Sequence, residues 1–227
     1  MFSLVGGTYT VTFTGSAPTA GTQCNGAYSG NFTGNITVSS SQVCVFVEGS
    51  VSGSIQLTNG TVDLVQSRVG GNLQISAGNF SITSGTSIAG NLQIQGAPTS
   101  SATSQVCGTT VKGDLTLQNN GTPVLVGSTD QSCPGNTVQG SITVQSNTAP
   151  ITIAGNTVTN NLTVQSNSAS TVVNGNRVRG NLVDKNNTAD TQVFTDQVHG
   201  NLQCSGNLSI TGGSDTAASK QGQCANF

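Results

Sequence analysis

Four side chains that could act together on a ligand lie near the end of the chain. The 227 residues include only six Lys or Arg, eight Asp or Glu and one His. Arg177, Arg179, Asp196 and His199 are close in sequence. Carboxylates beside Arg or His on one surface are typical of sites that bind or cleave glycans. These four residues are therefore a candidate ligand patch, for a carbohydrate-binding or carbohydrate-active protein.

Other kinds of chemistry find little support. The chain has no Cys-x-x-Cys pair and a single histidine, which disfavours zinc. The calcium repeat, the nucleophile elbow and the phosphate loop are absent. Six basic residues leave no basic stripe for nucleic acid, and no apolar run reaches the length of a membrane span. We expect no enzyme activity, no metal or other cofactor, no nucleic-acid partner and no membrane insertion.

The elements that must position these residues repeat about every 20 residues. Each repeat contains a unit of the form Gly-polar-apolar-polar-apolar, with Asn in place of Gly once. The steps between successive units are 19, 18, 19, 23, 27, 20, 20 and 20 residues. The nine units begin at Gly34, Gly53, Gly71, Gly90, Gly113, Gly140, Asn160, Gly180 and Gly200.

Alternation of apolar and polar residues in each unit indicates a half-buried strand. A second apolar pair, such as Ile151 and Ile153, precedes many units, and a valine such as Val158 stands just before the glycine. Three short strands per repeat predict an all-β, single-domain parallel β-solenoid of nine to ten rungs, right-handed by the usual preference. We place the N-terminal strand or cap at 1–23, the rungs at 24–204 and the C-terminal cap at 205–227.

Two sets of polar residues recur with the period of the coil. One set is Asn147, Asn167, Asn187 and Asn207, and the other is Asn136, Asn156, Asn176 and Asp196. They are interpreted either as turn formers, since Asn tolerates left-handed backbone, or as stacked amides that bond along the axis. Asp196 would then replace an asparagine at a corner.

Asp184 occupies an inward position that is apolar or Cys204 in every other unit. A buried carboxylate must be paired or neutralised. We therefore expect a local bulge that exposes Asp184, or a shifted backbone that turns Val183 inward.

The spacing of the six cysteines agrees with the coil. Sequential pairs are 20, 26 and 20 residues apart, and the longer spacing lies where the repeat lengthens to 27. Equivalent residues of adjacent rungs lie about 5 Å apart, which suits a disulfide. We predict the pairs Cys24–Cys44, Cys107–Cys133 and Cys204–Cys224. Disulfides indicate an extracellular or cell-surface protein, and the short start Met1–Val5, which resembles no signal peptide, suggests a mature chain.

A strand that lies outside the repeat register is expected near the N-terminus. It is either a cap or a strand donated to a neighbouring subunit. This putative subunit-contact strand consists of Thr8, Tyr9, Thr10, Val11, Thr12, Phe13 and Thr14.

The segments Gly200–Asn207 and Lys220–Cys224, together with the Asn-x-Val-x-Gly-Asn-Leu repeats, resemble a group of secreted bacterial repeat proteins. The resemblance covers residues 130–227 well and the earlier rungs loosely. It implies a right-handed parallel β-helix and an extracellular setting, and it transfers no catalytic residue.

The favoured function is a secreted structural or adhesive protein, a subunit of a filament or surface matrix that associates through its end strands. Its partners would be further copies, other surface proteins or glycans. A carbohydrate-binding or carbohydrate-active β-helix is the alternative. Ice binding is less favoured because Gln56, Gln74 and Gln93 interrupt the outward threonine column.

Overall fold

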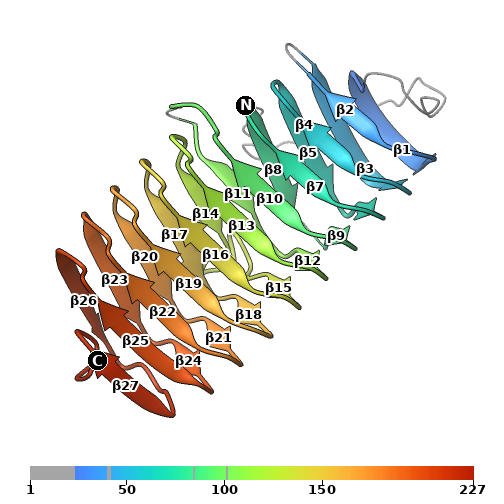
Figure 1. Cartoon of the computed structure of the whole chain (residues 1–227). Coiled ribbons are helices and arrows are strands. Elements are labelled where there is room, and N and C mark those ends of the chain that lie inside the picture. Colours follow the sequence, from blue (N-terminus) through green and yellow to red (C-terminus); the bar gives the residue numbers. More distant parts are fainter. Residues whose placement is uncertain (1–23, 40–41, 84, 101) are drawn as a thin grey trace.

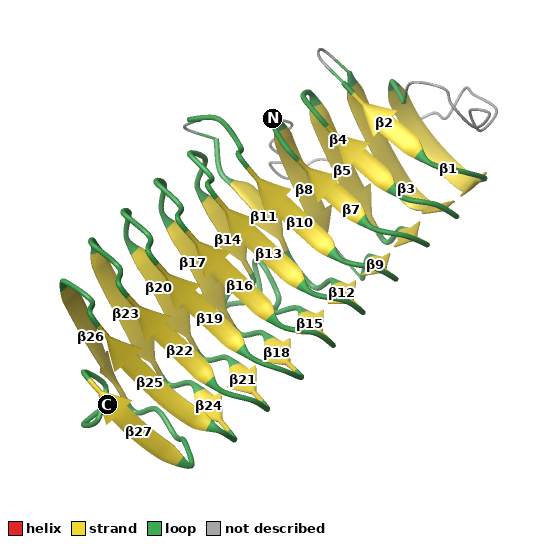
Figure 2. Cartoon of the chain, in the orientation of Figure 1, coloured by secondary structure: helices red, strands yellow, loops and turns green. Residues whose placement is uncertain are grey.

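The protein is a parallel β-solenoid. The computed structural model describes residues 24–39, 42–83, 85–100 and 102–227, and within these ranges every regular element is a strand. Successive turns stack along one axis from β1 to β27, and each full turn adds a strand to each of three faces (Figures 1 and 2). The predicted fold, with about ten turns of roughly 20 residues, is confirmed.

Face A is a sheet of ten short strands, one for each repeated unit and one more beyond the last unit. Its strands are β2 (Ile36–Val38), β4 (Ile55–Leu57), β7 (Leu73–Ile75), β10 (Leu92–Gln95), β13 (Leu115–Gln118), β16 (Ile142–Gln145), β19 (Leu162–Gln165), β22 (Leu182–Lys185), β25 (Asn201–Ser205) and β27 (Ser219–Gly222).

Faces B and C form a single sheet of 17 strands, because β1 and β3 continue around the corner between them. Face B consists of β1 (Gly26–Phe32), β3 (Val43–Val51), β5 (Thr61–Val65), β8 (Asn79–Thr83), β11 (Ser104–Val106), β14 (Val124–Val126), β17 (Ile151–Ala154), β20 (Thr171–Asn174), β23 (Asp190–Phe194) and β26 (Ser209–Gly213). Face C consists of β6 (Arg68–Val69), β9 (Ser87–Ile88), β12 (Thr110–Val111), β15 (Thr137–Val138), β18 (Thr157–Val158), β21 (Arg177–Val178) and β24 (Gln197–Val198).

The core is a set of apolar columns along the axis. Each face-A strand from β4 to β25 buries its first apolar residue above the equivalent residue of the preceding turn, because the pairing is parallel and in register. β-Branched and leucine side chains fill the interior, where a pleated strand turns every second residue inward. One such column is Ile36, Ile55, Leu73, Leu92, Leu115, Ile142, Leu162, Leu182 and Leu202.

The glycine that opens most units is required by close approach between turns. A Cβ on Gly90 would lie 2.1 Å from Asn72 Oδ1 and 2.9 Å from the carbonyl oxygen of Gly71. The following residue, Asn91, donates its backbone N–H to Asn72 Oδ1 at 2.8 Å. The Gly-Asn corner between faces C and A therefore links adjacent turns by a hydrogen bond that only a small preceding residue permits.

Three disulfides join consecutive turns, with the pairing predicted from the spacing. The Cα–Cα distances are 5.3 Å for Cys24–Cys44, 4.8 Å for Cys107–Cys133 and 5.3 Å for Cys204–Cys224. All six sulfurs are buried or nearly so, and the described residues contain no free cysteine.

Parallel strands continue past residue 204, within the segment 205–227 that was predicted as the C-terminal cap. Beyond residue 204, β26 still pairs in parallel with β23, and β27 pairs with β25 so that Cys204 lies opposite Gly222. Residues 205–222 therefore continue the coil, and the closing segment is only 223–227. The predicted N-terminal strand or cap, 1–23, with the strand Thr8–Thr14, lies outside the described residues.

Candidate functional sites

A buried ladder of asparagine side chains runs along the corner between faces A and B. Asn167 shows the pattern: its Oδ1 accepts the backbone N–H and the Nδ2 of Asn147, at 3.0 and 2.9 Å. Its own Nδ2 donates to Asn187 Oδ1 at 3.0 Å and to Val144 O of the preceding turn at 3.3 Å. Each amide therefore has partners on both sides. The members of this A–B ladder are Asn120, Asn147, Asn167, Asn187 and Asn207.

A second ladder, the B–C ladder, follows the corner between faces B and C. Asn156 Oδ1 accepts from the N–H and Nδ2 of Asn136, and Asn156 Nδ2 donates to Asn176 Oδ1 and to Val126 O, all within 2.9–3.0 Å. The ladder then changes chemistry, because its last two members are acids. Its members are Asn136, Asn156, Asn176, Asp196 and Asp215.

Of the two interpretations of these asparagines, the stacked amides are the ones observed. At most of these corners the left-handed residue is the one before the ladder asparagine, for example Ser146, Ser166 and Asn186, with φ of 54°, 55° and 55°. The ladder residue itself turns inward and is at most 6% exposed. A buried, fully bonded amide joins adjacent turns, and a turn former exposed to solvent would not.

Asp184 does not bulge out, contrary to expectation. It lies in register between Val164 and Cys204 on face A, and its side chain is fully buried. The A–B ladder explains how it is tolerated, because Asn187 Nδ2 donates to Asp184 Oδ1 at 3.0 Å. Asp184 Oδ2 has no hydrogen-bond partner, and burial raises the pKa of this carboxyl to about 7.

Asp196 is fully buried as well and continues the B–C ladder. Its Oδ1 accepts from the N–H and Nδ2 of Asn176 at 2.7 and 2.9 Å, as an asparagine oxygen does. Its Oδ2 stands where an amide nitrogen would donate, and it has no partner. Burial, with a smaller contribution from Asp215, raises the pKa of Asp196 to about 7, so that a proton on Oδ2 can imitate the missing N–H.

The candidate ligand patch is therefore divided by the fold. Arg177, Arg179 and His199 are exposed on face C, whereas Asp196 turns into the core from the preceding corner. Face C also carries Arg68 and Lys112, which the sequence patch did not include. The sequence did contain an indication that these cations share a face. In its repeat, each cation stands directly before or after the inward valine that precedes the Gly corner.

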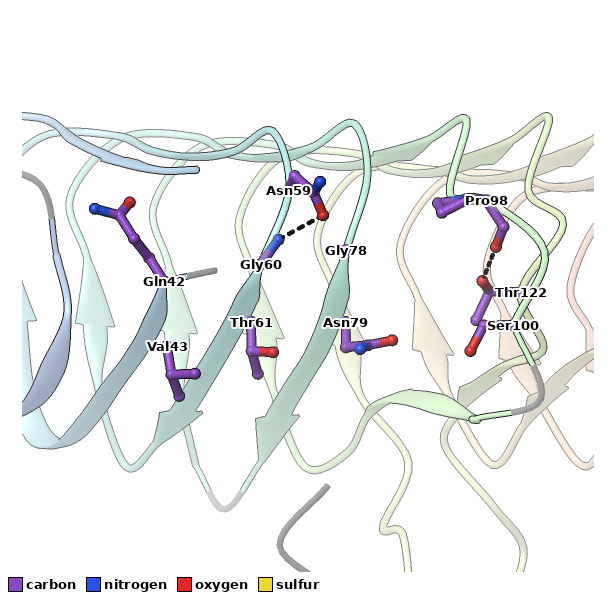
Figure 3. A pocket seen from close by; sticks show the side chains of 10 residues that line it. All are labelled: Gln42, Val43, Asn59, Gly60, Thr61, Gly78, Asn79, Pro98, Ser100 and Thr122. Atoms are coloured by element: carbon purple, nitrogen blue, oxygen red, sulfur yellow. Dashed lines mark hydrogen bonds between the residues drawn. The ribbon is translucent and has the colours of Figure 1, made fainter. Parts of the chain in front are cut away.

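A groove lies across the early turns. It has a volume of about 310 Å³ and is lined by turn and strand residues with no charged side chain (Figure 3). Asn59 Oδ1 accepts the N–H of Gly60 at 2.9 Å, and the Thr122 hydroxyl donates to the carbonyl of Pro98. Neutral amides and hydroxyls can bind a polar ligand. They supply no general acid or base, and no base that would activate a nucleophile.

Within the described ranges, no three His, Cys, Asp or Glu side chains lie close enough together to hold a metal ion. No helix in that part of the chain is long and apolar enough to cross a membrane. Protein-family models, curated proteins and solved structures give no match to this chain. The function is therefore inferred from the chain's own sequence, its fold and the sites described above.

Proposed function

We propose that the protein is a secreted structural or adhesive rod that associates end to end, as the subunit of an extracellular filament or surface matrix. The observation that supports this proposal best is the one-sided pairing of the last strands. Within the described residues, β26 pairs only with β23 among face-B strands, and β27 pairs only with β25. An unpaired parallel edge is a template for a further strand.

The side chains at the C-terminal end of the coil are suited to contact with a second copy of the chain. Leu208, which leads into β26, is 80% exposed and is the most exposed large apolar residue in the described part of the chain. The ring of Phe227 lies against Gly212 and closes the core, so Leu208 is not needed to seal it. A second copy that added its first turn here would make a head-to-tail contact, which extends into a filament unless it closes.

The extracellular setting rests on two supports. Three disulfides are consistent with an oxidising compartment. The resemblance of the late repeats to secreted bacterial repeat proteins supports the same location. A matrix role also suits a coil whose turns are linked at each corner by hydrogen bonds.

The test is the assembly state of the Leu208→Lys variant. We expect the wild-type protein to form filaments in electron microscopy and to sediment as oligomers, and the variant to remain monomeric. Thr116→Lys is the matched control, because it places the same charge on an outward position of face A in β13, near the middle of the row of strands that ends at β27. Wild-type protein that stays monomeric at high concentration, or filaments that persist in Leu208→Lys, would contradict the proposal.

A further inference from the structure

Face C concentrates positive charge in a protein whose net charge is −2. Four of the protein's six Lys and Arg residues, and its single histidine, lie on face C. The two outward columns of the face contain no acidic residue in the described turns. The first column is Asn31, Ser50, Arg68, Ser87, Thr110, Thr137, Thr157, Arg177, Gln197 and Thr216. The second is Ser52, Gly70, Ala89, Lys112, Gln139, Thr159, Arg179 and His199.

These cations have no partners of their own. Arg68, Lys112, Arg177 and Arg179 are exposed, and within the described residues their side chains form no ion pair or hydrogen bond. A structural role for them is therefore not visible, since a cation that stabilises a fold contacts an acid or a carbonyl. Unpaired cations of one sign on one face create a field that attracts an anion.

The spacing of the charges indicates what kind of anion would fit. Arg68 and Lys112 are two turns apart, Lys112 and Arg177 three turns, and Arg179 and His199 one turn. At about 4.8 Å per turn these steps are about 10, 14 and 5 Å. Duplex DNA carries one charge per about 1.7 Å, far denser than this row. A sparsely charged linear polymer matches it better.

Neutral residues between the cations complete the match. Thr157, Thr159 and Gln197 offer hydroxyl and amide groups next to Arg177 and Arg179, suited to sugar hydroxyls. The guanidinium groups of Arg177, in β21, and of Arg179, directly after it, can each bind a carboxylate through two hydrogen bonds. The groove shown in Figure 3 does not lie on this face, and a ligand on face C would lie along it as an extended chain.

Acidic residues lie at the borders of face C. Asp114 stands at the corner towards face A, where its Oδ1 accepts the N–H of Ser141 at 2.8 Å. Glu48 and Asp130 stand at or near the opposite corner, Asp130 on the loop before β15. These carboxylates repel an anionic chain from the edges and confine it to the middle of the face, along the axis.

We propose that face C binds a linear, carboxylate-bearing polysaccharide laid parallel to the solenoid axis, with Arg177 and Arg179 as the main contacts. This binding does not depend on end-to-end association, because a single rod presents the whole row. In a matrix it would attach protein filaments to an acidic glycan.

The test uses the full chain and alginate, a polymer of uronic acids, at low ionic strength. We expect Arg177→Gln/Arg179→Gln to weaken binding about tenfold or more, and single Arg179→Gln to weaken it less. Lys185→Gln is the matched control, because it removes one positive charge from face A. We expect it to change the affinity less than twofold. Circular dichroism checks the fold, which exposed, unpartnered side chains should not affect.

Four results would overturn the proposal. The first is no measurable binding of alginate by the wild type. The second is equal weakening by Arg179→Gln and Lys185→Gln, which would show a general charge effect. The third is duplex DNA bound as tightly as alginate, which would indicate an unselective polyanion site. Binding of neutral dextran with equal strength would likewise contradict a role for the carboxylates. Filaments that form normally in the double arginine variant would leave the assembly proposal intact.

Discussion

The corner between faces B and C is built in two ways along the same coil. The early turns hold Ser67 and Thr86, whose hydroxyl oxygens accept the N–H of the preceding turn at 3.4 and 3.3 Å. The later turns hold Asn156 and Asn176, whose amide oxygens accept the equivalent N–H at 2.9 and 3.0 Å. The longer side chain reaches the preceding turn at a better distance.

The number of turns linked by each residue also differs. Thr86 Oγ1 donates to Thr83 O of its own turn at 2.8 Å and lies 3.2 Å from Leu64 O of the preceding turn, so its single proton serves nearby carbonyls. An amide has two N–H groups, and Asn156 uses them to join the turns before and after it. The regular 20-residue repeat of the later turns stacks identical amides, which makes such a ladder continuous.

The largest effect is expected from removing a ladder amide. Asn156→Leu would leave the backbone N–H of Asn136 and one N–H of its Nδ2 without an acceptor. It would also remove the side-chain donor to Val126 O and one of the two donors to Asn176 Oδ1. At about 1–3 kcal/mol for each unsatisfied buried group, we expect a loss of about 5 kcal/mol. Thr86→Val, of similar shape, should cost about 2 kcal/mol. Urea unfolding of both variants would measure the difference.

Asn156→Asp serves as a control, because Asp196 shows that a carboxyl can occupy a ladder position. It should be tolerated at low pH, where the carboxyl is neutral, and destabilising at high pH. Equal losses for Asn156→Leu and Thr86→Val would show that the two kinds of corner are energetically equivalent.

The fully buried Asp184 and Asp196 of the later turns predict that stability depends on pH. Burial raises the pKa of Asp184 and Asp196 from 3.8 to about 7 in the folded state. The folded protein therefore binds more protons than the unfolded chain between these values. Stability from these groups is fully present below about pH 4 and falls as pH rises to about 7, by up to about 4 kcal/mol for each carboxyl.

Asp196→Asn removes one of these groups and restores the amide pattern. We expect it to stabilise the protein by roughly 2 kcal/mol at pH 8, where a buried charge would otherwise form, and by much less at pH 4. Melting temperatures measured across that range would show the difference. The idea fails if the variant is no more stable than the wild type at pH 8.

The smallest effect concerns the outward residues of face A. In the later turns Gln165 Nε2 donates to Gln145 Oε1 at 2.8 Å, whereas the early Gln74 and Gln93 make no such side-chain bond in the described structure. We expect Gln165→Ala and Gln93→Ala each to change stability by no more than about 0.5 kcal/mol, with Gln165→Ala the costlier of the two. A loss above 1 kcal/mol for either would mean that the outward columns matter as much as the buried ladders.

Much of the molecule followed from its spacing. The 20-residue period predicted the coil, and the intervals of 20 and 26 predicted the disulfide partners, because parallel turns place equivalent residues side by side. The cations were harder to group, since Arg68 and Arg177 are far apart in the chain. Their shared place within the repeat was the only indication that they share a face.

Asp184 and Asp196 show where spacing was insufficient. A period of two assigns inward and outward positions along a strand, and it placed Asp184 inward. It could not show that Asn187 would lie within hydrogen-bonding distance, and so the carboxyl was expected to bulge out. Asp196 belongs to a corner, where the backbone leaves the strand pattern and periodicity no longer says which side chain turns inward.

The sequence alone determined the fold, the stacking of equivalent residues and the cysteine pairs, because all three depend only on a repeat length and a strand period. The tertiary structure decided what the corners do. Left-handed residues such as Ser166 and Thr195 direct the next side chain into the core, which made a ladder of Asn167 and buried Asp196 away from Arg177. Charged residues are scarce because stacking places equivalent side chains of adjacent turns side by side, where like charges repel. The fold brings four of the six Lys and Arg residues together on face C.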